Sequence, residues 1–455
     1  MAIYFNGCWL IRVNSNNSQN SRLTKKQPVV SHDMDIFNIA TGLMVLTAIF
    51  GYVNVRFLKL PDTIGLMIIS IVFSLSIIVG HLVSPREFDA IWLLFNKIDY
   101  TTVVLDVMLS FLLFAGALHT DTRMLRSIWA SITLFALLGV VISTGMVAIL
   151  LYGALQLIGL PIDFFHCLLF GALISPTDPI AVLGILAKAN VPKNTEIKIV
   201  GESLFNDGVG VVIFLTLLGT TRPDAVPLTA QAVGWLFLEE AGGGLLLGLL
   251  LGYALFGLLK SIDHYQTEII ITIAVVMGGY WLATRLHVSG PLAVVVAGLL
   301  ISDQTRSAAM SSVTREYVDK FWEIIDILLN ALLFVLIGSR LVTLTFDWAF
   351  VPAALAGIVI MLVSRYGAVR LPLLLVQRWI KSDPQDPLML TWGGLRGGLS
   401  IAMALSIPET VAAKDLLVFV TYACVFFSVV VQGLTLSGVA RRLYRNTKPT
   451  VVTNT

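Results

Sequence analysis

The sequence predicts an all-α polytopic membrane protein of about thirteen transmembrane helices, built from inverted repeats in which two broken helices cross at mid-membrane. Three observations lead to this fold class. Hydrophobic residues make up 57% of the chain and charged residues 13%, about half the share usual in soluble domains. Apolar stretches of about 20 residues, enough to cross a bilayer, recur from Met34 almost to the end. Prolines or glycines interrupt two of these stretches.

Polar or proline-bearing turns separate the apolar stretches and define the expected helices. The ninth range is shorter than the ~20 residues that a perpendicular span requires. The thirteen ranges are 36–55, 62–83, 101–119, 128–157, 165–188, 197–219, 231–259, 267–285, 290–302, 321–344, 348–376, 386–406 and 416–438.

Residues 1–33 differ in composition from the rest of the chain. The stretch 14–27 is rich in Asn, Ser, Lys and Arg and has no apolar helical stripe, which predicts a disordered polar extension. Met34 directly precedes the first apolar range, so Met1 and Met34 are both candidate starts. The expected organisation is this extension, a transmembrane domain over 34–440 and a short cytoplasmic tail over 441–455.

Basic residues are distributed unequally between the expected loops. Loops after odd-numbered ranges, together with the tail, hold seventeen Lys or Arg residues, whereas loops after even-numbered ranges hold six. Cytoplasmic loops are enriched in basic residues. This asymmetry predicts that the C-terminus lies in the cytoplasm.

Composition also excludes several function classes. A formal net charge of +2 is too small to indicate a nucleic-acid partner. The three cysteines, Cys8, Cys167 and Cys424, are too few and too widely separated for a disulfide framework or a thiolate metal site. No resident cofactor is expected.

The two interruptions fall in the fifth and twelfth ranges. The fifth contains Ser-Pro-Thr-Asp-Pro, in which Pro176 and Pro179 each remove an amide donor and should open the helix. The twelfth contains four glycines at 393–398, among them Gly394 and Gly397, which weaken a helix and let backbones approach closely. Ranges seven apart cross a membrane in opposite directions. Broken helices in such positions are typical of inverted repeats whose binding site lies at mid-membrane.

Charged residues inside apolar ranges are costly and therefore mark candidate functional positions. Asp178 lies in the opened fifth range, where freed carbonyls could help to coordinate a cation, although a plain helix-capping role is the alternative. Arg396 could offset the carboxylates or orient the broken helix, and a side chain that extends to the surface is the alternative. The full set is Asp178, Glu202, Asp207, Arg365 and Arg396, with Asp106 and Asp326 as weaker candidates.

The sixth range carries polar residues with helical spacing. Ser203 and Asp207 are four residues apart and share one face, and Glu202 and Asn206 share the adjacent face. A carboxylate, a hydroxyl and an exposed carbonyl are hard oxygen ligands that suit Na⁺ or Li⁺. Burial favours the neutral form of a carboxyl, so a proton and a cation can compete for Asp207. Glu202, if charged, needs a partner, and Arg365 is the obvious one, in a pair that fixes packing.

Three motifs together resemble the sodium/proton exchanger family, in its prokaryotic NhaP-like branch. They are Gly-Ala-Leu-Ile-Ser-Pro-Thr-Asp-Pro at 171–179, Gly-Glu-Ser-Leu-Phe-Asn-Asp-Gly at 201–208 and Trp-Gly-Gly-Leu-Arg-Gly at 392–397. The resemblance covers roughly residues 36–440. It implies a homodimer in a bacterial plasma (inner) membrane, working by alternating access. It also implies core helices around 101–219 and 321–438, with the remaining helices for dimerisation and linking.

The resemblance also assigns residues. It implies ion binding at Asp207, Asp178, Thr177, Ser203 and Asn206, with Na⁺ held by the first four. The family's stabilising ion pair falls on Glu202 and Arg365, and its functional arginine on Arg396. Asn rather than Asp at 206 resembles the electroneutral branch. Where some relatives carry a glutamate in the third range, this chain reads Phe-Ala-Gly-Ala-Leu-His at 114–119, so K⁺ stays open beside Na⁺ and Li⁺.

Two other function classes compete with antiport. An intramembrane aspartyl protease would use Asp178 and Asp207 as its two carboxylates, but it would need them on intact facing helices. A sensor or structural membrane protein would leave the broken helices and buried charges without an evident use.

Overall fold

The computed structural model describes residues 32–84, 102–120, 122, 129–178, 182, 186, 191–220, 230–302, 308–340, 347–376 and 384–445. All regular elements in these ranges are helical, which confirms the all-α class. The first half of the chain forms α1 (His32–Val53), η1 (Asn54–Leu58), α2 (Asp62–Val83), η2 (Thr102–Met108), α4 (Leu109–Leu118), α6 (Trp129–Leu134), η3 (Phe135–Gly139), α7 (Val140–Ile158), α8 (Phe164–Ile174) and α10 (Lys193–Gly219). The second half forms α11 (Ala230–Lys260), α12 (Tyr265–Arg285), α13 (Gly290–Leu300), α15 (Ser312–Arg340), η5 (Trp348–Phe350), α16 (Val351–Val376), α17 (Asp386–Gly393), α18 (Gly398–Leu405), α19 (Lys414–Phe426), η6 (Phe427–Gln432) and α20 (Gly433–Leu443).

Each of the thirteen expected ranges overlaps a helix or a run of consecutive helices. Among the described residues, nine helices are long and apolar enough to cross a membrane, or ten if the bent pair α17 and α18 forms one span. Three shorter apolar helices cover 103–118, 164–174 and 290–300. The polytopic class is therefore supported, and the count of thirteen stays a prediction.

Local signals set several helix ends. The Ser289 hydroxyl accepts a hydrogen bond from Leu292 N at 3.3 Å, and Pro291 occupies the first turn of α13, where its missing amide donor costs nothing. Gly159 ends α7 with φ of +83°, a left-handed conformation that glycine adopts without strain. These signals explain why the apolar run divides at these positions.

Two helix ends differ from the expected ranges. α15 begins at Ser312, nine residues before the predicted 321, because its first turns carry charges on one face while Thr314 and Val318 are buried on the other. A search for continuous apolar sequence misses such an amphipathic start. α20 runs to Leu443 and so takes in the first residues of the predicted tail. Residues 1–31 of the predicted extension lie outside the described residues.

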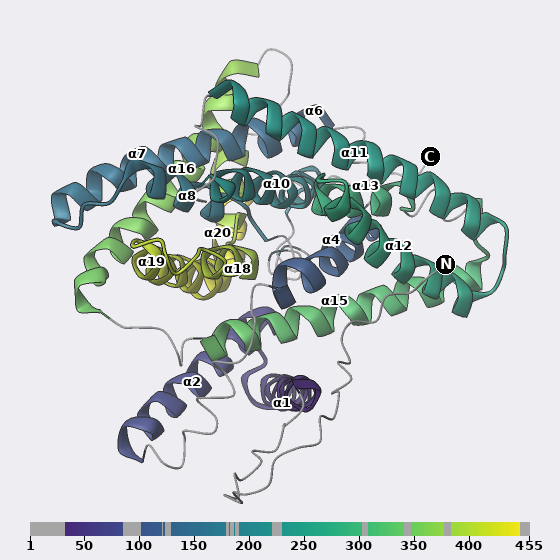
Figure 1. The fold of residues 1–455 in the computed structure, drawn as a ribbon, viewed down its shortest axis with the longest axis horizontal. Coiled ribbons are helices and arrows are strands. Elements are labelled where there is room, and N and C mark those ends of the chain that lie inside the picture. The colour runs from purple at the N-terminus through teal and green to yellow at the C-terminus, as the bar shows by residue number, and fades with distance from the viewer. Residues whose placement is uncertain are drawn as a thin grey trace, which may run out of the picture.

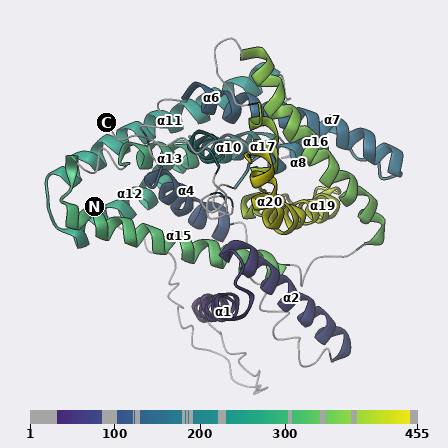
Figure 2. The ribbon, with the colours of Figure 1, turned by 180° about the vertical axis from the view of Figure 1, so that it is seen from behind.

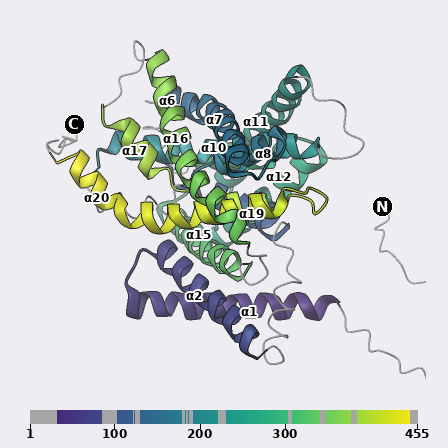
Figure 3. The same cartoon turned by 90° about the vertical axis from the view of Figure 1, so that its left-hand side faces the viewer.

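α10 occupies the centre of the molecule, next to α8, α11, α13 and α17 (Figure 1). In its apolar window 72% of the residues are buried, the largest share among the long apolar helices of the described ranges. α1 and α2 lie at one side, with α15 between them and the other helices (Figures 1 and 3). The same arrangement is seen from behind in Figure 2. Most residues in this part of α10 are thus enclosed by protein, whereas Leu215 is 45% exposed.

The two interrupted segments meet. α8 ends at Ile174 and residues 175–178 leave the helix, while α17 and α18 are bent by 55° around the non-helical residues 394–397. Asp178 N donates to Leu395 O at 2.7 Å. A Cβ on Gly397 would overlap the Asp178 side chain, so this approach requires glycine. The prediction of two broken helices that cross is confirmed. Pro179 lies outside the described residues.

Candidate functional site

The break after α8 is fixed to α10 by a group of buried polar side chains. Thr177 N donates to Asn206 Oδ1 at 3.1 Å, and Asn206 Nδ2 donates back to Thr177 Oγ1 at 2.8 Å. The hydroxyls of Thr177 and Ser203 are hydrogen-bonded at 2.8 Å. All three side chains are buried. Asn206 therefore replaces the backbone partner that the helix interruption removes from Thr177.

Arg396 satisfies the carbonyls that the break sets free. Its guanidinium donates to Ser175 O and Pro176 O, and its backbone N donates to Ser428 Oγ at 2.8 Å. The residue is 1% exposed, so the alternative of an arginine that extends to the surface is not what the structure shows. Arg396 places a positive charge directly at the opened helix end, where carbonyl dipoles favour a cation.

Glu202 and Arg365 face each other inside the protein. Arg365 donates to both carboxylate oxygens, at 2.5 Å and 2.8 Å, and its side chain also donates to Leu390 O at 3.3 Å. Side-chain exposure is 1% for Glu202 and 5% for Arg365. The pair thereby joins α10, α16 and α17, with both charges compensated in a two-point geometry.

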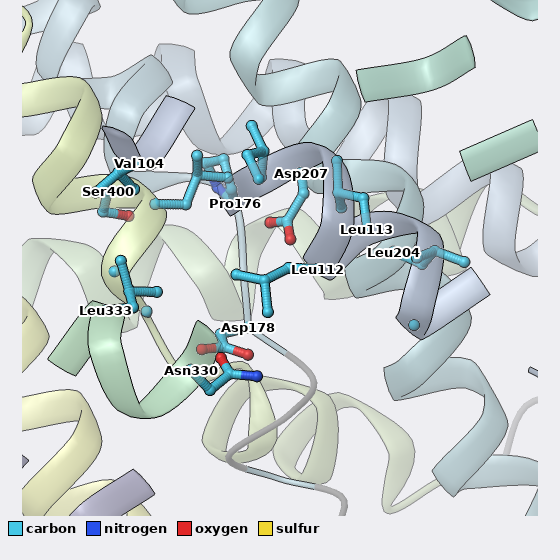
Figure 4. A pocket seen from close by; sticks show the side chains of 15 residues that line it. Val104, Leu112, Leu113, Pro176, Asp178, Leu204, Asp207, Asn330, Leu333 and Ser400 are labelled. Atoms are coloured by element: carbon cyan, nitrogen blue, oxygen red, sulfur yellow. The ribbon is translucent and has the colours of Figure 1, made fainter. Parts of the chain in front are cut away.

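A small cavity lies between the break, α10 and α15. Its volume is about 60 Å³, enough for a few water molecules. Asp178 and Asp207 both line it, and both are half-buried. Figure 4 shows their carboxylates on this cavity, with Leu112 between them in this view and Asn330 next to Asp178. Most of the remaining wall is apolar: Val104, Leu109, Leu112, Leu113, Gly116, Pro176, Leu204, Leu333 and Leu399.

The weaker candidates fall in different places. Asp326 lies one turn before Asn330 on α15 and accepts a hydrogen bond from its amide at 3.1 Å. The side chain of Asp106 lies outside the described part of the structure. No cluster of three or more His, Cys, Asp or Glu side chains able to hold a metal occurs among the described residues.

A second buried ion pair was missed by the sequence analysis. Lys198 contacts Asp386 at 2.5 Å, and Thr195 Oγ1 donates to the same carboxylate at 3.0 Å. Asp386 is fully buried. Both partners stand near the beginnings of helices, α10 and α17, where charged residues are ordinary. No signal in the sequence separates them from surface charges.

The arrangement suits reversible binding of one small cation or proton. Two carboxylates share a small, mostly apolar cavity, in which uncompensated charge is costly. Arg396 offsets one negative charge, and Glu202 is already paired. Asp178, Asp207 and Arg396 together then carry a net charge of one negative unit, which an alkali ion or a proton can neutralise.

Comparison with known proteins gives concordant matches. The transmembrane sodium/hydrogen exchanger family matches residues 44–442. The Na⁺/H⁺ antiporter NhaP of Pseudomonas aeruginosa is 46% identical over 417 residues, covering 90% of this chain and 97% of that protein. The Na⁺/H⁺ antiporter NhaH of Halobacillus dabanensis is 32% identical, covering 90% and 98%. The structure of the sodium proton antiporter MjNhaP1 from Methanocaldococcus jannaschii superimposes with a TM-score of 0.71 at 18% identity, covering 90% of this chain and 99% of that one, and supports the fold.

Proposed function

Because the chain belongs to the sodium/hydrogen exchanger family, in its prokaryotic NhaP-like branch, we propose that it exchanges Na⁺ or Li⁺ for protons by alternating access. It is a secondary transporter rather than an enzyme, which removes the aspartyl protease alternative. In this proposal H⁺ and the cation compete for Asp207. The observation that carries it is the shared cavity, which Asp207 lines from α10 and Asp178 from the broken segment.

Competition for Asp207 follows from the charges at the break. Leaving Asp207 ionised and alone in an apolar cavity is unfavourable, so it is neutralised by either a proton or a cation. Binding of one displaces the other, and each carries one positive charge. Exchange is therefore electroneutral, one proton for one monovalent cation.

The other site residues have distinct roles in this proposal. Asp178 supplies a second carboxylate, and we assign the hydroxyls of Thr177 and Ser203, which are hydrogen-bonded to each other at 2.8 Å, as further oxygen ligands. Asn206 takes part by holding Thr177, since its amide oxygen already accepts from Thr177 N. Pro176, Pro179, Gly394 and Gly397 keep the crossing open, and Glu202 with Arg365 fixes the helices around it.

The proposal extends to assembly and location. The chain works as a homodimer in a bacterial plasma (inner) membrane, with the C-terminus in the cytoplasm. The multi-pass helical fold supports the membrane location, and the basic-residue asymmetry supports the cytoplasmic C-terminus. K⁺ is the second candidate cation, because the segment 114–119 holds no glutamate and the α4 residues that line the cavity in the described part of the chain are leucines and Gly116.

Transport in everted vesicles tests the function. Vesicles from a strain without its own exchangers are energised, and dequenching of a ΔpH dye is recorded after adding NaCl, LiCl or KCl. The parent should respond to NaCl and LiCl, and Asp207→Asn should abolish the response because the amide binds neither a proton nor a cation with the required strength. Asp163→Asn, an exposed carboxylate at the start of α8, serves as control and should match the parent.

Two results would contradict the proposal. A parent protein that responds to none of the three cations between pH 6 and pH 9 is not such an antiporter. Normal exchange in Asp207→Asn would be compatible with the antiport function but would show that the exchanged ions bind elsewhere than at Asp207.

A further inference from the structure

Asn330, on α15, is a buried polar residue in the cavity wall that the proposed mechanism does not yet use. It is 5% exposed and lines the cavity together with Asp178 and Asp207. Figure 4 shows its side chain beside the Asp178 carboxylate. α15 belongs to neither broken segment, so Asn330 approaches the site from a third direction.

The orientation of the Asn330 amide is fixed by its own helix. Nδ2 donates to Asp326 Oδ1 at 3.1 Å and to Asp326 O at 2.9 Å. These two bonds use both amide hydrogens. Oδ1 is then the amide atom that is not bonded to Asp326, and no group in the described part of the chain donates a hydrogen bond to it.

An amide oxygen held next to a carboxylate is unfavourable unless something positive lies between them. Two acceptors side by side repel each other. A bare or partly hydrated alkali cation between them removes this repulsion, since hard oxygen ligands suit it. The residues of α4 that line the cavity in the described part of the chain are Leu109, Leu112, Leu113 and Gly116.

We propose that Asn330 Oδ1 is a ligand of the transported alkali cation, together with Asp178 and Asp207 of the same cavity, and that Asp326 is the positioning residue that orients it. This inference rests on the proposed cation/proton exchange and names a further residue of that same site. It gives the cation a neutral oxygen from a helix outside the two broken segments. The alternative is that a water molecule alone occupies this position, without contact between Asn330 and the cation.

Cation dependence of exchange in everted vesicles separates these two cases. Asn330→Ala should raise the apparent KM for Na⁺ and Li⁺ about tenfold, equivalent to about 1.4 kcal/mol, with maximal exchange within about twofold of the parent. Asp326→Asn should raise KM in the same direction but less, since the Asn330 oxygen remains while the hydrogen bond from its Nδ2 to a carboxylate is replaced by a weaker one to an amide. Ser339→Ala, a buried polar residue of the same helix whose hydroxyl bonds Leu336 O, is the matched control and should keep the parental KM.

Cation-dependent stabilisation of the purified protein gives a second readout. Na⁺ should raise the thermal midpoint of the parent in detergent by mass action, and the same Na⁺ concentration should stabilise Asn330→Ala less. If Asn330→Ala does not reach the membrane, the KM of Asp326→Asn decides in its place.

The outcomes are distinguishable. Parental KM values for both cations in Asn330→Ala, or a fall in maximal rate alone, would overturn the ligand role and leave a water site. A parental KM in Asp326→Asn beside a raised KM in Asn330→Ala would overturn the role of Asp326 while supporting Asn330. A parent without any cation response would instead refute the exchange function itself.

Discussion

Glu202 and Arg365 are separated by 163 positions in the chain, yet each is the other's charge partner. Their pairing was a sequence hypothesis because both stand inside apolar ranges, where a lone charge is costly. The same reasoning could not predict the ion pair between Lys198 and Asp386, because both residues stand near the beginnings of helices. At the residue scale, a buried charge is visible in the sequence only when its neighbours along the chain are apolar.

Removing one member of the Glu202–Arg365 pair should destabilise the protein strongly. Glu202→Ala leaves the Arg365 guanidinium buried without its carboxylate, and breaking such a pair costs about 3–5 kcal/mol. We expect less folded protein in the membrane and a lower thermal midpoint in detergent, with apparent Na⁺ affinity of the surviving fraction close to the parent.

An exposed ion pair supplies the control. Glu316 and Lys320 are bonded at 2.6 Å on the surface of α15, with more than 60% of each side chain exposed. Surface ion pairs contribute little to stability, so Glu316→Ala should have the same thermal midpoint in detergent as the parent. A Glu202→Ala protein as stable as Glu316→Ala would contradict the structural role of the buried pair.

At the scale of elements, the interruptions matter because of what approaches them. α10 passes close to the first break, where a Cβ on Gly210 would overlap the Pro176 ring. Gly397, in the second break, leaves room for Asp178. The prolines open one helix and the glycines let the other come near, so the two motifs act together at one contact.

Gly397→Ala should impair exchange more than folding. The added methyl group overlaps Asp178, which must move from its place on the cavity. We expect the maximal rate of Na⁺-driven dequenching to fall at least about tenfold, since displacement of about 1 Å at a reacting group can cost about 100-fold.

A glycine in open space is the comparison for that variant. Gly145 lies within α7 with nothing near its would-be Cβ, so Gly145→Ala should keep activity and gain up to about 1 kcal/mol from helix propensity. Equal activity of the two variants would show that the Asp178 position tolerates displacement.

At the scale of the whole molecule, helices that pack at the edge and helices in the centre have different sequences. α10 carries Glu202, Ser203, Asn206 and Asp207, and 72% of its apolar window is buried, whereas only 17% is buried in the window within 38–58 that overlaps α1. Polar residues in a central helix are satisfied by protein partners, and lipid offers none. This difference in burial agrees with a site carried by the central helices and with flanking helices that carry no site residues.

The orientation of the molecule can be tested with C-terminal reporters. The basic loops and α20, which ends with Arg441 and Arg442 in its last turn, should lie on the cytoplasmic side. A green fluorescent protein fused after the tail should therefore fluoresce in cells, and alkaline phosphatase at the same position should be inactive. The opposite result, with both fusions showing expression, would reverse the predicted topology.

The sequence by itself determined the membrane class, the approximate positions of the apolar helices, the two interruptions and the charged residues that stand inside apolar ranges. Each of these depends on residues near one another in the chain, so composition and spacing are sufficient. Only the tertiary structure decided that Asn206 holds Thr177, that Arg396 bonds the carbonyls of the other break, that Lys198 pairs with Asp386, and that Asn330 faces Asp178. These contacts join elements far apart in sequence, and their geometry follows from how the helices pack rather than from any local pattern.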